Sequence, residues 1–75
     1  MLITIVYSEQ FTSNAKSLST AIKEKWSGAS VNLMGTFGKT DSFSRYQVQI
    51  GRDIIYHSDS VTDNNSIINL IEERL

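Results

Sequence analysis

The amino-terminal stretch is the least interrupted apolar run of the chain. Residues 2–7 read Leu-Ile-Thr-Ile-Val-Tyr, in which β-branched and aromatic types predominate. A run of this kind is typical of a strand that is buried on both faces, and such strands lie inside a sheet rather than at its edge. The pattern therefore predicts a central strand at the start of the chain.

A helical periodicity follows this strand after a short turn. The apolar stripe has spacings of three and four residues and consists of Ala15, Leu18, Ala21, Ile22 and Trp26. Thr12 or Ser13 precedes the stripe and is suited to cap the free amides of a helix, whereas Gly28 follows it and is suited to a left-handed helix stop. The spacing predicts a helix over residues 13–27.

Three further segments have the pattern of strands. Residues 30–34 alternate polar and apolar types, as a half-buried strand does. Residues 45–50 alternate as well, and the link Gly51-Arg52 joins them to a strand-like run over residues 53–57. Two such runs about a short glycine-containing link predict a β-hairpin.

The remaining segments are a long loop and a final helix. Residues 35–44 combine two glycines with Ser, Thr and Asp, and they also contain Phe37 and Phe43, of which at least one is expected to reach the core. Asp63 or Asn64 can cap the final helix. The apolar stripe of that helix consists of Ile67, Ile68, Leu70, Ile71 and Leu75.

The predicted order is β-α-β-β-β-α, which is an α/β fold with helices packed on a four-stranded mixed sheet. The first two strands should be parallel, with a right-handed crossover. Because the first strand is the most apolar, we place it centrally and predict the sheet order 2-1-3-4, the thioredoxin-like arrangement. Residues 1–75 make one domain.

Composition excludes several classes of protein. The chain of 75 residues has no cysteine, so it contains neither a disulfide nor a Cys/His zinc cluster, and its stability must come from a small core. Its formal net charge is −1 without any basic run, which argues against nucleic acid or an anionic membrane as partner. The apolar run at the start is too short for a signal peptide or a membrane span, so we expect a soluble cytoplasmic protein.

Several short features together resemble a known family. They are Ile5-Val6-Tyr7 before the turn, a helix that ends near Trp26, Gly35-Thr36 after the second strand, and the hairpin over residues 46–58 that ends in Ile-Tyr-His-Ser. Together they cover nearly the whole chain, and they resemble the selenoprotein W-like (Rdx) family of small thioredoxin-like proteins. The resemblance implies a fold of that kind and a functional turn directly after the first strand.

The turn itself departs from that family. The family carries Cys-x-x-Cys, or selenocysteine in the second position, directly after the tyrosine, whereas this chain has Ser8-Glu9-Gln10-Phe11. Thiol–disulfide chemistry needs a thiolate as nucleophile and a second thiol to resolve the mixed disulfide. Neither a hydroxyl nor a phenyl ring can replace them, so the redox activity of the family does not carry over to this turn.

Other candidate chemistry is weaker. Ser8 as a nucleophile would need a base, and the only histidine is His57; a turn serine that bonds local backbone is the simpler interpretation, and His57 at a strand end is more simply solvated than a base or pH switch. Residues 35–40 suggest a phosphate loop, but Leu33 stands where the motif needs glycine, and no helix is predicted to follow.

Acidic and aromatic residues also have simple interpretations. Glu9 could form a carboxylate pair with Asp53 or Asp59 only if the fold brings them together, and no spacing supports a metal site or another cofactor site. Trp26 is more simply a core anchor than a ligand platform.

Two functions remain as hypotheses. The first is a redox-inactive thioredoxin-like module that binds another protein as an inhibitor or adaptor, with Ser8, Glu9, Gln10, Phe11 and Phe37 as the contact and an exposed edge strand as a possible addition. The second is an oxidoreductase-related protein of the selenoprotein W type that acts with the thiol of a partner. For Phe11, a ring that folds under the helix and a ring that points outward are both open.

Overall fold

The computed structural model describes residues 1–35 and 46–74. Its elements are β1 (Leu2–Tyr7), the 3-10 turn η1 (Glu9–Phe11), α1 (Thr12–Lys25), β2 (Ser30–Gly35), β3 (Tyr46–Ile50), β4 (Asp53–Ser58) and α2 (Asn64–Arg74). Most of the predicted 35–44 loop lies outside the described residues, and so do Phe37 and Phe43.

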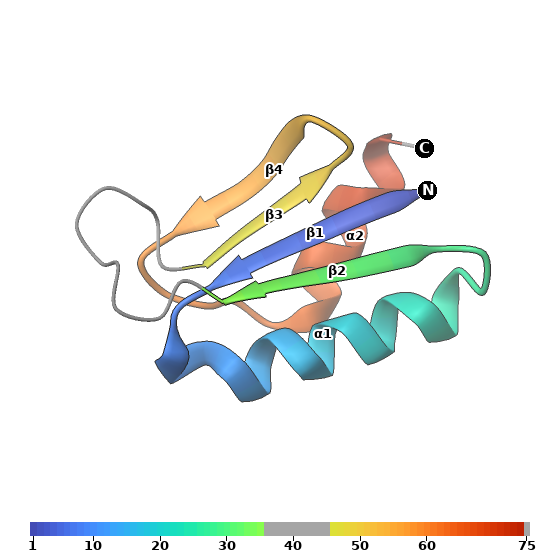
Figure 1. Ribbon diagram of the computed structural model, residues 1–75. Coiled ribbons are helices and arrows are strands. Elements are labelled where there is room, and N and C mark those ends of the chain that lie inside the picture. Colours follow the sequence, from blue (N-terminus) through green and yellow to red (C-terminus); the bar gives the residue numbers. More distant parts are fainter. Residues whose placement is uncertain (36–45, 75) are drawn as a thin grey trace.

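The four strands form one mixed sheet in the order β2-β1-β3-β4. Strand β1 pairs in parallel with β2 and antiparallel with β3, and β3 pairs antiparallel with β4. This arrangement confirms the predicted α/β fold, its sheet order and the central place of the first strand. Figure 1 looks onto the sheet with α2 behind it and α1 along the side of β2.

One apolar core lies between the sheet and both helices. Every second residue of β1 faces it, and the stripes of α1 and α2 cover it from the other side. Its buried members are Ile3, Ile5, Tyr7, Ala15, Leu18, Ile22, Tyr46, Val48, Ile67 and Ile71. Because α1 and α2 share this core, both helices cover the same face of the sheet.

The other face of the sheet has no second layer among the described residues. On β1, Leu2 is 51% exposed and Val6 is half-buried, while Thr4 is buried between its register neighbours Asn32 and Gln49. The expectation that the first strand is buried on both faces therefore holds at Thr4 but not at Leu2. The reason is that both helices pack on one face, so only neighbouring side chains shield the other.

The ends of α1 also differ from the prediction. The Thr12 hydroxyl donates to the Glu9 carbonyl at 2.7 Å, and no side chain caps the helix, because the η1 turn already precedes it. Gly28 is not left-handed. The helix ends instead where Trp26 becomes extended, while the Trp26 N–H still donates to the Ile22 carbonyl at 2.8 Å.

Two other local predictions are confirmed. Gly51 has a φ of +59°, which is a conformation that glycine adopts without steric cost, so the β3–β4 link turns where expected. Asp63 caps α2, because its carboxylate accepts bonds from the Ser66 N–H at 3.2 Å and the Ser66 hydroxyl at 2.8 Å.

Truncation of the central strand tests the core. We expect Ile5→Ala to lower the free energy of unfolding by about 2–5 kcal/mol, because Ile5 is fully buried and the helices cannot close the cavity. Ile54→Ala removes the same atoms from a side chain that is 49% exposed and serves as the control. Equal denaturation midpoints for the two variants would contradict a core centred on β1.

The cap of α2 makes stability depend on pH. The Ser66 hydroxyl, and then the Ser66 N–H, hold the pKa of Asp63 below its ordinary value of 3.8. The carboxylate therefore stabilises the fold above that value, and this contribution is lost as pH falls through the lower folded-state pKa.

We expect Asp63→Asn, which keeps a capping oxygen, to lose less stability than the natural protein on acidification below about pH 4. Thermal unfolding followed as a function of pH measures this. Asp59→Asn removes a nearby charge without removing the cap and should respond to acid as the natural protein does. If Asp63→Asn also loses as much stability on acidification as the natural protein, the titration of Asp63 does not contribute to the pH dependence of stability.

Candidate functional site

The turn Ser8–Phe11 lies where the parallel strands β1 and β2 end. Tyr7 is in register with Gly35 and Val6 with Met34, so the last residues of β2 are the direct neighbours of the turn (Figure 1). In open α/β sheets the carboxyl ends of the strands are the usual place for ligand contacts. The turn and the end of β2 therefore form the candidate site.

Ser8 is a structural residue of this turn. It is 8% exposed, and among the described residues its Oγ has no hydrogen-bond partner and no contact with solvent. The Ser8 carbonyl accepts a bond from the Phe11 N–H at 2.9 Å, which closes the turn. A hydroxyl that neither a base nor solvent reaches is not prepared for nucleophilic attack.

Phe11 points inward rather than away from the molecule. It is half-buried and packs against the core, and its ring meets that of Tyr46 edge to face, with 5.9 Å between centroids and an interplanar angle of 76°. Tyr46 in turn meets Tyr56 in the same way at 6.2 Å. Of the two orientations that the sequence left open, the structure has the ring folded under the helix.

Tyr46 is the centre of this aromatic cluster of Phe11, Tyr46 and Tyr56. Burial, and then the neighbouring Tyr56, raise the pKa of Tyr46 to about 12. Its phenol therefore stays neutral at physiological pH, and the cluster supplies packing rather than a titrating group.

The exposed part of the turn is polar. Glu9 and Gln10 are exposed, while Ser8 and Phe11 are held inward and Phe37 lies outside the described residues. The structure thus brings four of the five predicted site residues together, but only two of them offer side chains to a partner.

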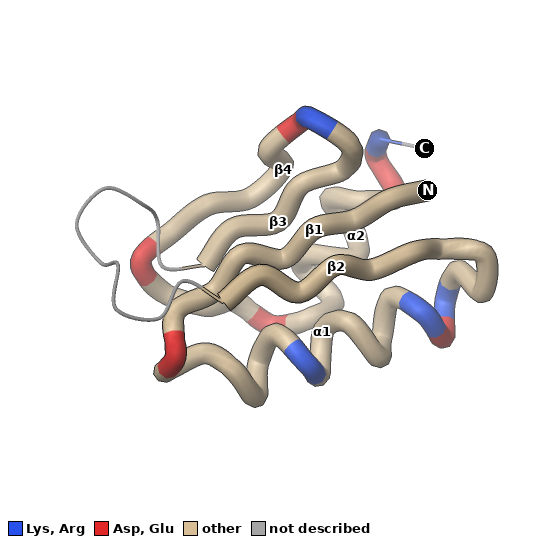
Figure 2. Tube along the Cα trace, viewed as in Figure 1, with Lys and Arg blue, Asp and Glu red and all other residues tan. Residues whose placement is uncertain are grey.

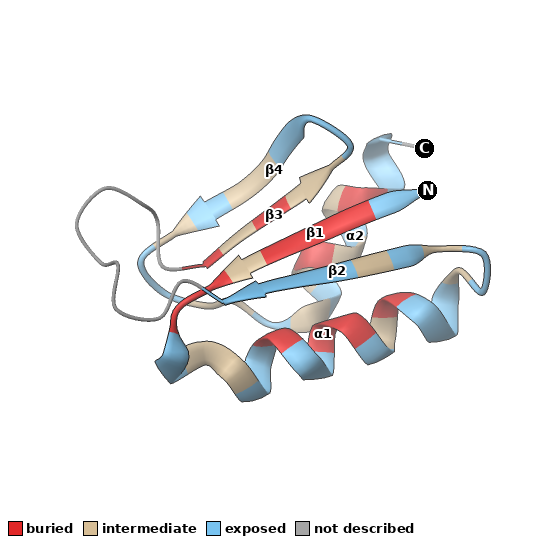
Figure 3. Cartoon of the chain, viewed as in Figure 1, coloured by how far each residue is buried: buried red, intermediate tan, exposed pale blue. Residues whose placement is uncertain are grey.

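The exposure of two apolar residues beside the turn was not predicted from the sequence. Leu33 is 37% exposed and Met34 is 51% exposed, and both belong to β2, which is an edge strand. The alternation in residues 30–34 predicted one buried face, yet most of this strand is exposed (Figure 3). The signal that could have located them is the 2-1-3-4 order, which puts this apolar segment at an edge.

The titratable candidates do not converge. Asp53 is in register with Ile50 and through it with Ile3, so it lies toward the end of the sheet opposite to Glu9. His57 is exposed on β4, and β3 separates that strand from β1. Asp59 follows β4 and is likewise two strand spacings, about 10 Å, from the end of β1. Within residues 1–35 and 46–74, no group of three or more His, Cys, Asp or Glu could hold a metal ion.

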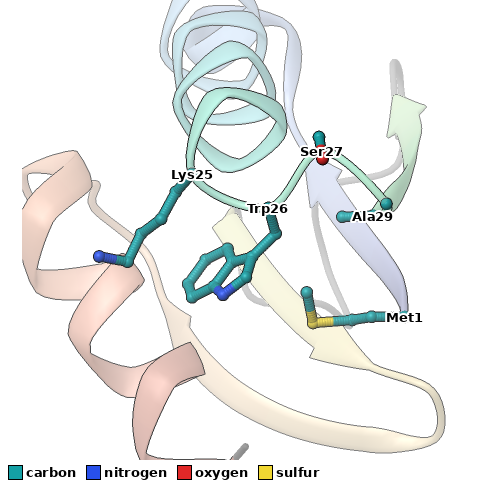
Figure 4. A pocket seen from close by; sticks show the side chains of 6 residues that line it. Met1, Lys25, Trp26, Ser27 and Ala29 are labelled. Atoms are coloured by element: carbon teal, nitrogen blue, oxygen red, sulfur yellow. The ribbon is translucent and has the colours of Figure 1, made fainter.

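A concave feature lies at the end of β1 opposite to the turn. It is an open depression of about 480 Å³, lined by Met1, Lys25, Trp26, Ser27, Gly28 and Ala29 (Figure 4). The Lys25 ammonium lies 5.6 Å from the centre of the Trp26 ring and pairs with Glu72 of α2. Since Trp26 also packs against the core, it is the anchor that the sequence predicted, and the depression borders it.

Comparison of the chain with models of protein families, with characterised proteins and with solved structures finds no match. The resemblance to the selenoprotein W-like family accordingly stays a prediction from short sequence features. In the described part of the chain, neither helix is long and apolar enough to cross a bilayer.

Substitution of Phe11 tests whether the turn is a structural element. We expect Phe11→Ala to lower the free energy of unfolding by about 1–3 kcal/mol, because it removes a half-buried ring and its contact with Tyr46. Chemical denaturation measures this change.

Ser8→Ala is the matched variant at the other end of the turn. We expect it to leave stability unchanged or to raise it by about 1 kcal/mol, because the hydroxyl that it removes is buried without a partner among residues 1–35 and 46–74. A Phe11→Ala protein as stable as the natural one would mean that the ring is free to contact a partner.

Proposed function

We propose that this chain is a redox-inactive, thioredoxin-like module that binds another protein through the turn after β1 and the adjoining end of β2. It acts as an adaptor or inhibitor in the cytoplasm. The exposed side chains of the contact are those of Glu9, Gln10, Leu33 and Met34. Ser8 and Phe11 hold the turn in shape from below.

The observation that carries the proposal is the pair of exposed apolar side chains on an uncharged edge strand. Leu33 and Met34 are consecutive residues of β2, so their side chains point to opposite faces of the sheet along the same edge strand. Both residues adjoin a turn whose exposed residues are polar, and large apolar side chains exposed at a sheet edge commonly mark a contact.

Catalysis is less well supported. The chain has no cysteine, and the Oγ of Ser8, which occupies the first cysteine position of the resembled family, is buried. The turn therefore has no sulfur with which the thiol of a partner could form a disulfide. These two facts favour the binding hypothesis over the oxidoreductase alternative.

Affinity capture from a lysate of the native host tests the proposal. We expect the natural protein to retain a partner that Met34→Arg loses, since a buried interface does not accept an unpaired charge. Ile54→Arg, at a similarly exposed apolar residue on the opposite edge strand, is the control and should retain the partner.

An insulin-reduction assay completes the test. The natural protein should not accelerate reduction above the rate of the buffer, because no thiol is available. Turnover that disappears in Ser8→Ala would instead favour the enzyme, and capture that Met34→Arg does not affect would remove the end of β2 from the contact.

A further inference from the structure

Within the described residues, the free edge of β2 has an open row of backbone groups. The Ser30 N–H donates to the Met1 carbonyl at 2.8 Å, so Ser30 is bonded toward β1. Successive residues of a strand direct their backbone groups to alternate sides, so Asn32 and Met34 also face β1. It follows that Val31 and Leu33 direct their N–H and C=O groups outward, where another strand can pair with them.

This edge lacks the features that commonly prevent strand addition. Residues 30–35 contain neither a charged residue nor proline, and they include no described bulge. Figure 2 shows β2 without any charged position along its length. An edge of this kind is a ready template for an extended segment.

Two lysines of α1 lie beside this edge. Ser17 accepts a bond from Asn64 at 3.0 Å and Lys25 pairs with Glu72, so this side of α1 faces α2. At 3.6 residues per turn, Lys16 and Lys23 lie roughly 100–180° around the helix from those contacts. They therefore lie on the side of α1 away from α2, and Figure 1 shows that α1 runs along β2, the edge strand of the sheet.

The two ammonium groups are available to a ligand. Lys16 and Lys23 are exposed, and within the described ranges neither belongs to an ion pair. They are seven residues apart, which places them within roughly 20° of each other and about 10 Å apart along the helix. Residues two or four positions apart on one face of a strand are separated by about 7 or 13 Å, so flexible lysine side chains can meet acids with either spacing.

These charges argue against a second copy of the chain as the occupant. If two β2 edges paired antiparallel about a two-fold axis, the two α1 helices would lie side by side on the same face. Lys16 of one copy would then approach Lys23 of the other, so four ammonium groups would lie close to one another. Like charges placed in this way disfavour association.

We propose that the free edge of β2 binds an extended acidic peptide segment by strand addition. The segment pairs with the outward backbone groups of Val31 and Leu33, and its carboxylates face Lys16 and Lys23. This inference rests on the proposed protein-binding function and names the chemical class of the partner and the mode of its binding.

The probe is a synthetic peptide of about nine residues, long enough to span β2. Valine and polar residues alternate along this peptide. Aspartate stands at two of the polar positions that are four residues apart. A second peptide carries lysine at those two positions. Both are titrated into isotope-labelled protein while the backbone amide signals are followed by NMR. We expect the aspartate peptide alone to bind and to shift the signals of residues 30–35.

Two variants connect the binding to the edge and to the lysines. Leu33→Pro removes an outward N–H but no bond to β1, and proline is tolerated in this position of an edge strand, so the fold should persist while peptide binding is lost. The double variant Lys16→Glu, Lys23→Glu should weaken binding of the aspartate peptide at least about ten-fold and should bind the lysine peptide instead. Arg52→Glu, in the β3–β4 link at the far side of the sheet, is the charge control and should leave binding unchanged.

Several outcomes would overturn the inference. They are equal binding of the two peptides, binding that survives in Leu33→Pro, and no binding of the aspartate peptide at millimolar concentration. A dimer in light scattering that Leu33→Pro dissociates would show that a second copy occupies the edge. If peptide binding fails while Met34→Arg still abolishes capture of a partner, only strand addition is wrong; if both fail, the proposed function is wrong as well.

Discussion

The packing of both helices on one face of β1 is the interaction on which the rest of the structure depends. Ile3 and Ile5 are fully buried beneath the stripes of α1 and α2, and Tyr7 continues the same face toward the turn. A chain of 75 residues can form only a small apolar core, and here that core lies on one face of the sheet. The other face has no covering layer among the described residues. The uncovered face and the exposed edge follow from the small size of this core.

The same packing determines the character of the turn after β1. Phe11 packs edge to face against Tyr46, and Tyr46 packs in the same way against Tyr56. These ring contacts join the turn to the core. The pKa of Tyr46, raised to about 12, follows chiefly from this burial.

The proposed binding function rests on the surface that the described residues expose. Leu33 and Met34 lie on an edge strand, and Lys16 and Lys23 lie along the helix beside it. Backbone groups, apolar side chains and cations together match an extended acidic segment, whereas the titratable residues Glu9 and His57 belong to separate parts of the fold.

The sequence by itself determined the elements and their order. The apolar run of β1, the helical stripe through Leu18 and Ile22, and the hairpin at Gly51 are local signals, because each depends on periodicity or on a backbone conformation that one residue type favours. The sheet order followed from the contrast between the apolar first strand and the alternating others. The place of the candidate turn was likewise readable, since it directly follows the first strand.

Only the tertiary structure decided which surfaces are covered. Local patterns do not say whether two helices lie on one face of a sheet or on both, so the burial of Leu2 was predicted wrongly. They also do not say whether Phe11 turns inward, because this depends on Tyr46, which lies far along the chain. The exposure of Leu33 and the position of Lys16 beside an open edge depend in the same way on contacts between distant segments, and these contacts are what local periodicity does not encode.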